Sequence, residues 1–506
     1  MKLYTSLEEN VQEIERRFAD CGDLVSRTFP VGERQENQMH ITYIDMMVDR
    51  DLIETKIMRS LMQSIRQTPL SALYIKSDVF AALKNGGILT AEVEEKDDFD
   101  QITLAMLSGD TVLFLDGHAK AFVVSTKGWP NRGVPQAESE VVVQGSKEAF
   151  NEVFRVSSAL IRRRIRDTRL KLKQMKVGRR SQTDVGLMYL EDVARPAILE
   201  EIENKIQNID ADAILDSGAI AQYIEDDWLS PFPQVEVTER PDKAAAAILD
   251  GRIVILVDTS PFVLIAPTTL NAMVQSSEDF YQRWHIMSAT RFLRYVAGFL
   301  ALALPALYIA VAVYHPSMLP TLLAYKMAGA RQMVPFPAVV EVILMDFSFE
   351  LLREAGIRLP GPIGGAIGIV GGLIIGQAAV EAGLVSPIVV IIVALTGICG
   401  FAVPSVQLVS GCRLMKYILI FSAAFLGLFG FWIGLLFILV HLVSLKSFGI
   451  PYMFPYASGE VNQFSDFKDT LIRLPLFMMK NRPIFANQNA KRRLDPPETG
   501  NRHDKE

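Results

Sequence analysis

Several signatures of known chemistry are absent from this chain of 506 residues. It contains no phosphate loop, no nucleophile elbow and no HExxH motif, and its six histidines are scattered. Three cysteines, Cys21, Cys399 and Cys412, are too few and too far apart for a disulfide framework or a metal site, which indicates a reducing compartment. We therefore expect no enzyme, no cofactor and no bound metal.

Strong charge of either sign is also lacking. The net charge of −6 gives no reason to expect nucleic acid as a partner. The N-terminal stretch MKLYTSLEENVQEIERRFADCGD has no apolar core of the kind that a secretory signal needs. We expect the first half of the chain to stay in the cytoplasm.

Charged and apolar residues are separated along the chain. Most charges lie before Arg294 or after Lys446, and most long apolar runs lie between them. This pattern predicts an α/β cytoplasmic region of two repeated subdomains and an α-helical polytopic membrane domain. The expected parts are an α/β subdomain at 1–138, a second at 139–284, a transmembrane domain at 285–446, and a cytoplasmic C-terminal segment at 447–506 whose tail, from residue 484, is disordered.

The repeat is visible as two similar segments. AMLSGDTVLFLD matches AILDGRIVILVD at a shift of 142 residues, so that Gly109 aligns with Gly251 and Asp116 with Asp258. A duplication of one α/β plan explains this alignment. The two aspartates end equivalent strands, and turn formation explains them better than a carboxylate site, because aspartate readily binds nearby backbone amides.

A basic run follows the first subdomain, between Ser146 and Lys176. One interpretation is contact with anionic lipid head groups, since basic clusters near a membrane are attracted to them. The other is a solvated or subunit-facing surface of an amphipathic helix. We favour the second, because charge runs are usually solvated and Leu160, Ile161 and Ile165 suggest an amphipathic helix.

Membrane topology follows from the basic residues that flank the apolar runs. Arg291 and Arg294 precede the first span and Lys446 follows the last, so the positive-inside tendency puts both ends in the cytoplasm. An even number of crossings is required, and we expect four. The spans are Tyr295–Tyr314, Pro362–Val380, Pro387–Val403 and Tyr417–Val443, the last long enough for Gly427 and Gly430 to bend it.

The second of these spans has two distinct faces. One face carries a glycine at every fourth residue, which allows another backbone to pack closely. The opposite face is aliphatic and ends, at its C-terminal side, with the amide side chain of a glutamine. The glycine face consists of Gly364, Gly368, Gly372 and Gly376, and the other of Ile363, Ile367, Val370, Ile374 and Gln377. We interpret the glycine face as a helix-packing seam.

Charged residues precede this span on one helical stripe: Asp346, Glu350, Arg353 and Glu354. Acids inside an apolar sequence are unlikely to face lipid. The stripe fits a ring that attracts cations in an oligomer. It fits equally well a salt-bridge network that holds the helix against its neighbours.

Four segments carry a resemblance to a known family: VPFPAVVEVILMDFSFELLREAGIRLPGPIGGAIGIVGGLIIGQAAVEAGLVSP, RPDKAAAAILDGRIVILVDTSPFVLIAPTTL, SFGIPYMFPYAS and FKDTLIRLPLFMMKNRP. They closely resemble the A subunits of the spore germinant receptors, the GerA family, which also includes an accessory spore membrane protein of the same architecture. The likeness covers nearly the whole chain, from about Asp23 to Pro483.

The resemblance implies a multi-pass protein in the inner membrane of a bacterial spore, in contact with membrane lipid. It also implies a homo-oligomeric ring, a pentamer, that forms an ion channel and triggers germination. The channel opens when nutrient binds a partner B subunit that resembles an amino-acid transporter, and a lipoprotein C subunit completes the complex.

In such a ring, one helix from each subunit lines the axis. The uncharged span Pro362–Val380 suits that position, with Ile363, Ile367, Val370, Ile374 and Gln377 as pore-lining residues. The alternative is that this aliphatic face touches lipid. Two other functions stay open: an accessory channel or scaffold of the same family, and a monomeric transporter, which the lack of visible repeats in the membrane half disfavours.

Overall fold

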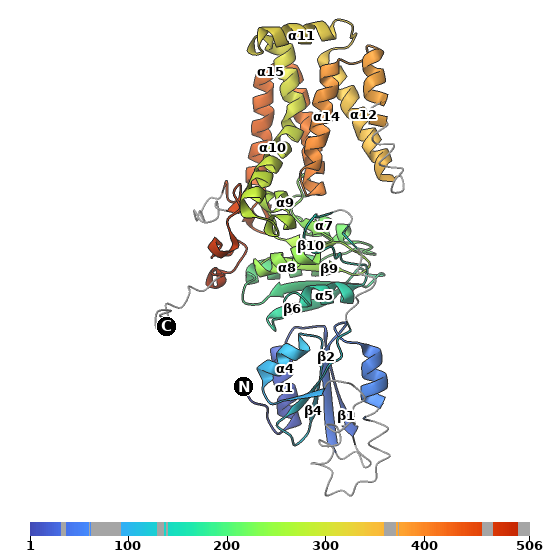
Figure 1. Ribbon diagram of the computed structural model, residues 1–506, viewed down its shortest axis with the longest axis vertical. Coiled ribbons are helices and arrows are strands. Elements are labelled where there is room, and N and C mark those ends of the chain that lie inside the picture. The colour runs from blue at the N-terminus through green and yellow to red at the C-terminus, as the bar shows by residue number, and fades with distance from the viewer. Residues whose placement is uncertain are drawn as a thin grey trace, which may run out of the picture. The chain divides into compact units, whose positions relative to one another are not determined.

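The chain folds into two units, one built of sheets with helices and the other mainly of helices (Figure 1). The computed structural model describes residues 1–31, 37–59, 61, 93–128, 136–137, 140–358, 371–372, 374–457 and 469–493. One unit comprises Met1–Ile224, Val235–Pro267 and Met479–Glu506, and the other Glu225–Gln234 and Thr268–Met478. The first contains the α/β structure and the second the helical bundle, while the four-part division expected from the sequence stays a prediction.

The first sheet has five antiparallel strands in the order β1-β2-β4-β5-β3. Strands β4 and β5 are buried on both faces, and their side chains alternate between two cores, as the period of two in a strand requires. The elements are α1 (Leu7–Arg17), β1 (Leu24–Val31), β2 (Asn37–Ile44), the π-helix η1 (Leu52–Met58), β3 (Val93–Lys96), α4 (Phe99–Met106), β4 (Thr111–Leu115) and β5 (Ala121–Val124).

The second sheet has the corresponding strand order, β6-β7-β9-β10-β8. In both sheets one helix precedes the first strand, helical residues follow the second, and another helix follows the third. The elements are α5 (Phe154–Arg162), β6 (Leu170–Val177), β7 (Thr183–Leu190), α6 (Pro196–Gln207), α7 (Ser217–Ile224), β8 (Glu236–Thr238), α8 (Pro241–Leu249), β9 (Ile253–Val257) and β10 (Val263–Ala266).

Asp116 and Asp258 occupy equivalent places in the two sheets. The Oδ1 of Asp116 accepts a hydrogen bond of 3.3 Å from the backbone N–H of Leu7, and that of Asp258 one of 3.1 Å from Phe154. Leu7 and Phe154 are the first residues of α1 and α5, where backbone N–H groups have no partner within the helix. Both aspartates therefore bind backbone amides, as expected, but at a helix N-terminus distant in sequence rather than in the local turn.

His40 lies in β2 and is buried in the first sheet. Its Nδ1 is 2.8 Å from Thr28 Oγ1 and its Nε2 is 3.2 Å from Ser26 Oγ, both on β1. Burial lowers the pKa of the imidazole to about 4. The ring is therefore a neutral, hydrogen-bonded part of the sheet.

The basic run contributes ion pairs inside the α/β unit. Arg162 is fully buried, and its Nη2 donates to Asp23 Oδ1 at 2.7 Å. Arg163 and Arg164 are largely buried, and both pair with Glu148. The favoured interpretation, a solvated or subunit-facing surface, is wrong for Arg162, which is fully buried against an acid 139 residues away that periodicity does not reveal; for the rest of the run it stays a prediction.

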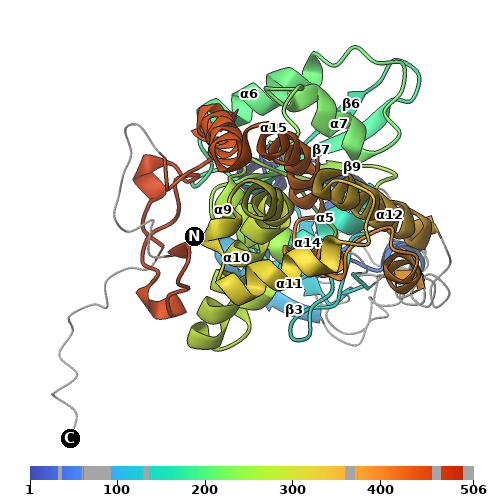
Figure 2. The same cartoon turned by 90° about the horizontal axis from the view of Figure 1, so that it is seen from above.

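The helical unit contains α10 (Trp284–Ile309), which continues through the π-helical turn η5 (Ala310–Tyr314), and α11 (Thr321–Arg331). It continues with α12 (Ala338–Arg358), α14 (Pro387–Phe401) and α15 (Val406–Ser444). In Figure 2, α11 lies across the ends of the other helices. Among the described residues, Trp284–Tyr314 and Val406–Ser444 are helices long and apolar enough to cross a membrane, and Pro387–Phe401 is a shorter apolar helix.

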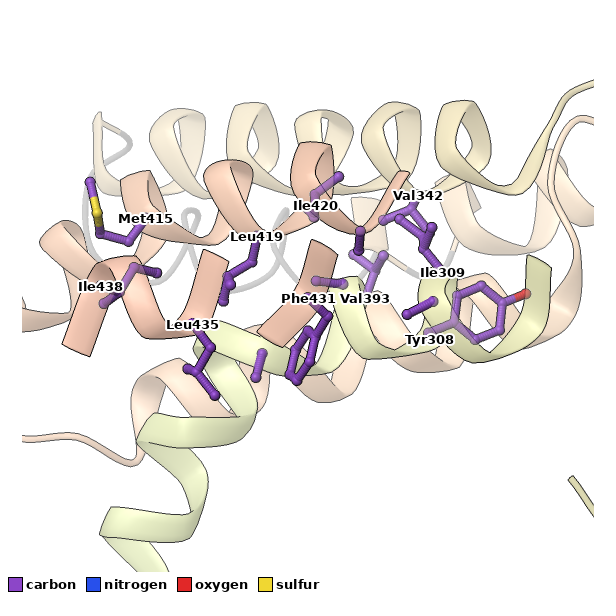
Figure 3. Packing of buried hydrophobic residues seen from close by; sticks show 14 of the residues in the cluster. Tyr308, Ile309, Val342, Val393, Met415, Leu419, Ile420, Phe431, Leu435 and Ile438 are labelled. Carbon is purple, nitrogen blue, oxygen red and sulfur yellow. The ribbon is translucent and has the colours of Figure 1, made fainter. Parts of the chain in front are cut away.

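Helix α15 is a hairpin of two antiparallel arms, residues 406–426 and 428–444, joined at Gly427 (φ 62°, ψ −136°). Gly434 of the second arm lies against Leu419 and Ser422 of the first. Gly411 and His441 both contact residues 230–232, although a straight helix would separate them by about 45 Å. Figure 3 shows buried side chains of both arms in one cluster.

This reversal corrects the expected last span. The sequence predicted one crossing, Tyr417–Val443, with a bend, whereas the structure has two arms that turn back on each other. A continuous helix of 39 residues would be about 58 Å long, nearly twice the hydrocarbon thickness of a bilayer. Each arm by itself is close to the length that one crossing needs.

The chain enters and leaves the helical bundle at the same end. After α15, strands β11 (Lys446–Ser447) and β12 (Ile450–Pro451) form a short ladder. Ser447 Oγ accepts a hydrogen bond from Thr268 N at 3.0 Å, and Tyr452 O accepts one from Leu270 N at 2.9 Å. Thr268 and Leu270 precede α10, so the two ends of the bundle are joined by hydrogen bonds.

The C-terminal segment then returns to the second sheet. Ile484, Phe485 and Ala486 are buried, and Arg195 donates from Nε to the carbonyl of Ala486 at 3.1 Å. The expectation of a disordered tail from residue 484 is thus wrong for 484–493, because three apolar side chains find a core to bury in. Residues 494–506 lie outside the described residues.

Candidate functional site

Buried charges inside the apolar bundle form the strongest candidate site. Asp346 of α12 and Lys416 of α15 are both almost completely buried, and Lys416 Nζ donates to Asp346 Oδ1 at 2.6 Å. Charged side chains among apolar helices are costly unless they are paired, and they commonly mark functional positions. This ion pair joins the acidic stripe of α12 to the first arm of the hairpin.

A second set of charges lies one helical turn along the same stripe. Glu350 pairs with Arg353 on its own helix and accepts a hydrogen bond of 3.3 Å from Arg413 of α15. Arg413 also donates to Ser410 Oγ at 2.7 Å. Asp346, Glu350 and Arg353 are therefore in ion pairs, and Glu354 has interactions of its own.

A small cavity lies among these side chains, between α12, α14 and α15. Its volume is about 40 Å³, and its wall includes Asp346, Arg353, Thr396 and Arg413. Asp346 Oδ2 and Arg413 Nε lack a hydrogen-bond partner among the described residues. A polar cavity of this size has room for water, which would supply the missing hydrogen bonds. The charged side chains thus line a water-sized cavity inside an apolar bundle.

A separate buried acid fixes the N-terminal part of α12. Glu341 is fully buried, and its two carboxylate oxygens accept from Arg331 Nε at 3.2 Å and from the backbone N–H of Ser386 at 2.9 Å. Arg331 ends α11, and Ser386 is the N-cap of α14. Glu341 therefore joins three helices, and its oxygens are satisfied by these contacts.

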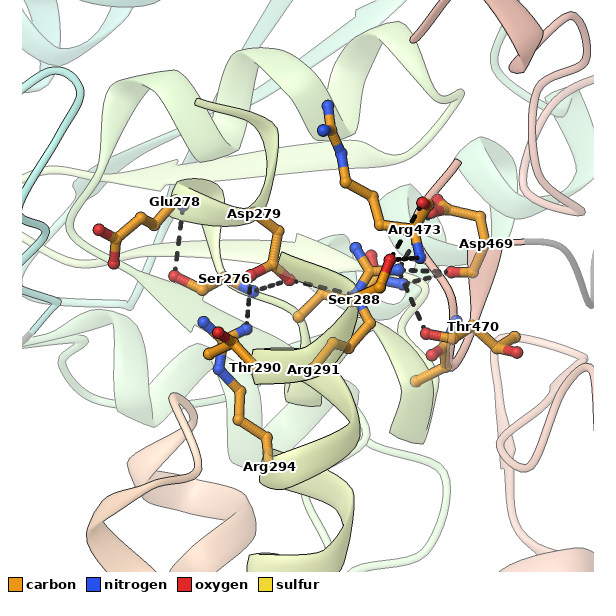
Figure 4. A network of polar contacts seen from close by, with 12 residues as sticks. Ser276, Glu278, Asp279, Ser288, Thr290, Arg291, Arg294, Asp469, Thr470 and Arg473 are labelled. Atoms are coloured by element: carbon orange, nitrogen blue, oxygen red, sulfur yellow. Dashed lines mark hydrogen bonds and ion pairs between the residues drawn. The ribbon is translucent and has the colours of Figure 1, made fainter. Parts of the chain in front are cut away.

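Helix α10 begins in a polar network, drawn in Figure 4. Asp279, which is fully buried, accepts from Arg291 Nε at 3.2 Å and from Arg294 Nη1 at 2.7 Å. Arg291 also pairs with Asp469 at 3.0 Å. Burial raises the pKa of the Asp469 carboxyl, although Arg291 opposes the shift. Both arginines that suggested the topology thus bind Asp279 in the turn just before α10, and Arg291 also joins α10 to the C-terminal segment through Asp469.

The predicted pore and packing residues are only partly described. Ile363, Ile367, Val370, Gly364 and Gly368 lie outside the described residues.

The helix at residues 374–381 places Ile374 and Gln377 on its exposed side, and Gln377 donates to Glu381 at 2.9 Å. Gly376 lies against Val390 of α14, and Gly372 is close to Leu352 of α12. Pore lining by Ile374 and Gln377, and the packing role of the glycine stripe, stay predictions.

Sequence reasoning missed Arg413 and Lys416, the cations of the charged cluster. The last span was expected to begin at Tyr417, which made both residues appear as ordinary flanking charges. A signal was available: the two cations are three residues apart, hence on one helical face, as are the acids of α12. Among the described residues, no group of three or more His, Cys, Asp or Glu side chains is arranged to hold a metal ion.

The α/β unit, the apolar bundle and its buried charges define a membrane-associated protein with a folded polar region. The family described as Bacillus/Clostridium GerA spore germination protein matches residues 12–485. The chain belongs to this GerA family and has a role in spore germination.

Relatives from Bacillus match over nearly their full lengths. Spore germination protein KA of Bacillus subtilis is 38% identical over 488 residues, covering 96% of this chain and 88% of the relative. Spore germination protein GerLA of Bacillus cereus is 38% identical over 485 residues and covers 96% of both chains. Uncharacterized membrane protein YfkQ of Bacillus subtilis is 37% identical over 503 residues, covering 98% of this chain and 95% of the relative.

A solved structure also matches. It is the N-terminal domain of the A subunit of the Bacillus megaterium spore germinant receptor GerK3, with 33% sequence identity and a TM-score of 0.40. The match covers 53% of this chain and 96% of that chain.

Proposed function

We propose that this protein is the A subunit of a nutrient germinant receptor, and that it forms the ion channel whose opening triggers spore germination. It resides in the inner membrane of the spore as a homo-oligomeric ring, a pentamer, with its N-terminal region in the cytoplasm. A B subunit that resembles an amino-acid transporter binds the nutrient, and a lipoprotein C subunit completes the complex. Both partners are inferred from the likeness to receptor A subunits.

The observation that carries this proposal is the charged cluster of Asp346, Glu350, Arg353, Arg413 and Lys416 around a water-sized cavity. A purely structural bundle gains nothing from charges whose remaining polar atoms lack partners. Ion pathways, by contrast, need polar groups and water at membrane depth. We propose that the Asp346–Lys416 pair holds α12 against the hairpin in the closed channel and separates on opening.

The proposed topology has six crossings, two more than the sequence suggested. The hairpin adds one crossing, because its two arms replace the single last span. The joined ends of the bundle require an even number, so α12 (Ala338–Arg358) must also cross. At 21 residues it is long enough to do so. A duplicated α/β plan on the cytoplasmic side completes the proposal, supported by the matching strand orders.

The experiment that tests the channel is reconstitution of the purified full-length protein. Native mass spectrometry of the detergent complex gives the number of subunits, and the same preparation in liposomes reports the release of trapped monovalent cations. We expect a ring with low basal flux. Ile367→Ala and Val370→Ala are expected to raise that flux, because shorter side chains widen the apolar constriction, which then excludes water less effectively.

A matched control is Ile391→Ala in α14, whose exposed side chain lies outside the predicted pore face. This variant is expected to keep the basal flux of the wild-type protein. A monomer whose liposomes stay tight with all three variants contradicts the channel and leaves membership of the family intact.

A further inference from the structure

An exposed tryptophan lies on a short loop of the helical unit. Residues 225–234 carry Trp228 and Leu229 at the tip, and these side chains are 80% and 73% exposed. The two residues are adjacent and form an apolar tip, and contiguous exposed apolar surface marks sites of protein or membrane interaction. Neither the charged cluster nor the predicted pore involves this loop.

The loop is held in one conformation by its own polar groups. Gln234 is fully buried, and its Oε1 accepts from the backbone N–H groups of Asp226 and Asp227, each at 3.0 Å. Its Nε2 donates to the carbonyl of Asp227 at 2.7 Å, and its own N–H donates to Glu225 Oε1 at 3.0 Å. The carboxylates of Asp226 and Asp227 accept from the backbone N–H groups of Phe448 and Leu229, each at 3.1 Å. The tip therefore presents its two apolar residues from a fixed base.

The base of the loop is attached to both arms of the hairpin. Ser230 Oγ lies 2.9 Å from His441 Nε2, and the rings of Phe232 and His441 lie 6.0 Å apart. The carbonyl of Pro231 lies directly against Gly411 of the first arm. His441 is one turn from the end of α15, so the loop lies at the level where the hairpin leaves its apolar stretch.

Exposed apolar side chains continue from this level along the second arm. Phe437, Val440 and Val443 surround His441 in sequence and are about half exposed or more. Two further exposed aromatic residues, Tyr281 and Trp284, lie at the start of α10, at the same end of the bundle. Trp and Tyr concentrate at membrane–water boundaries, because the ring is apolar and the N–H or O–H group needs a polar partner.

We propose that residues 225–234 are a membrane-interface anchor, in which Trp228 and Leu229 insert among the lipid head groups beside the hairpin. The attachment of the loop's base to His441, which exposed apolar side chains flank on the second arm, favours lipid over a protein partner. The loop then fixes the depth of the hairpin ends in the bilayer, and with it the depth of the charged cluster on the first arm. The inference rests on the membrane placement of the bundle, which the controls below test separately.

The test uses the full-length protein in nanodiscs with Trp228 as the only tryptophan. The chain has four, so Trp129, Trp284 and Trp432 are replaced by Phe. Nanodiscs contain lipid brominated either near the head group or near the end of the acyl chain, because bromine quenches tryptophan at short range. Iodide in the aqueous phase reports exposure to water.

Two further single-tryptophan proteins serve as controls. One keeps Trp432, which is exposed on the second arm, and is quenched by brominated lipid if the bundle spans the membrane. The other carries Leu104→Trp, at an exposed position of α4 in the α/β unit, and is quenched by iodide alone.

We expect Trp228 to lose most fluorescence with lipid brominated near the head group and less with lipid brominated near the chain end. Quenching by iodide without quenching by bromine overturns the anchor and shows a solvated loop. Protection from both quenchers also overturns it, because the tip is then covered by protein. If Trp432 is quenched by bromine in these cases, the membrane placement of the bundle stands while the anchor fails.

Discussion

The reversal of α15 at Gly427 is open to a direct chemical test. An ideal Cβ at Gly434 lies 3.4 Å from the Cβ of Ser422 on the opposite arm. This separation is close to the Cβ–Cβ distance of a disulfide, about 3.5–4.5 Å. In a continuous helix the same two positions would be about 18 Å apart along the axis, far beyond the reach of a disulfide. The double variant Ser422→Cys/Gly434→Cys therefore bridges only if the hairpin exists.

The assay is oxidation of the full-length protein in membranes, in a background where Cys21, Cys399 and Cys412 are replaced by Ala. Mass-tagging of the thiols that stay free, before and after reduction, gives the bridged fraction.

The matched control is Ser410→Cys/Ser422→Cys, a pair that is also twelve residues apart but lies on one arm of the hairpin. We expect the first pair to bridge nearly completely and the control pair not at all. Equal labelling of the two pairs would refute the hairpin, and with it the six crossings.

A second prediction concerns Gly427, the residue at which α15 reverses. Its φ of 62° and ψ of −136° lie in a region that side chains avoid, at a cost of about 1–3 kcal/mol. An added Cβ would also lie 2.8 Å from Cγ of Tyr314. Gly427→Ala is therefore expected to lower the temperature at which the solubilised protein aggregates. The double variant with Tyr314→Gly removes the colliding Cβ and Cγ but not the backbone strain, so relative to Tyr314→Gly alone the loss is smaller than in the wild-type background.

Two further predictions concern buried charge. Asp346→Asn or Lys416→Met alone leaves an uncompensated buried charge, which lowers the stability of the fold by about 3–5 kcal/mol, whereas the double variant is nearly neutral. The temperature of aggregation in detergent measures the loss of stability. Lys326→Met, at an exposed position, is the control and is expected to leave that temperature unchanged. His40 has a folded pKa of about 4, so the unfolded chain binds more protons between that value and about 6.5. Neutral His40 therefore contributes about 3 kcal/mol to the free energy of unfolding; this contribution is fully present above about pH 6.5 and is lost as the pH falls to about 4. Hydrogen exchange of the β2 amides, corrected for intrinsic rates, should show the loss in the wild-type protein and not in His40→Gln.

Local patterns in the sequence predicted much of the fold. The equivalent strands that Asp116 and Asp258 end were expected from apolar runs, and α14 from an uncharged stretch that begins at a proline. These elements follow from neighbours only two to four residues apart, so periodicity and composition suffice to find them. Membership of the family was also available from the sequence, because long ordered motifs extend over most of the chain.

Partners across long stretches of chain were decided only by the tertiary structure. Asp346 and Lys416 are separated by 70 residues, and Asp23 and Arg162 by 139. Charge alone showed that Asp346 needs a partner, but several cations are available and sequence spacing does not choose between them. For the same reason the acidic stripe of α12 fitted two interpretations until Arg413 and Lys416 were located beside it.

The amino-acid sequence by itself determined that apolar helices follow an α/β region and that some of their charges had to be buried. It did not determine where the last helix reverses, because Gly427 is one of several glycines in an apolar helical run and glycine is ordinary in such helices. The reversal becomes favourable only when the second arm packs on the first and both ends reach residues 230–232. Packing between distant segments, and not local propensity, therefore decided the topology of this bundle.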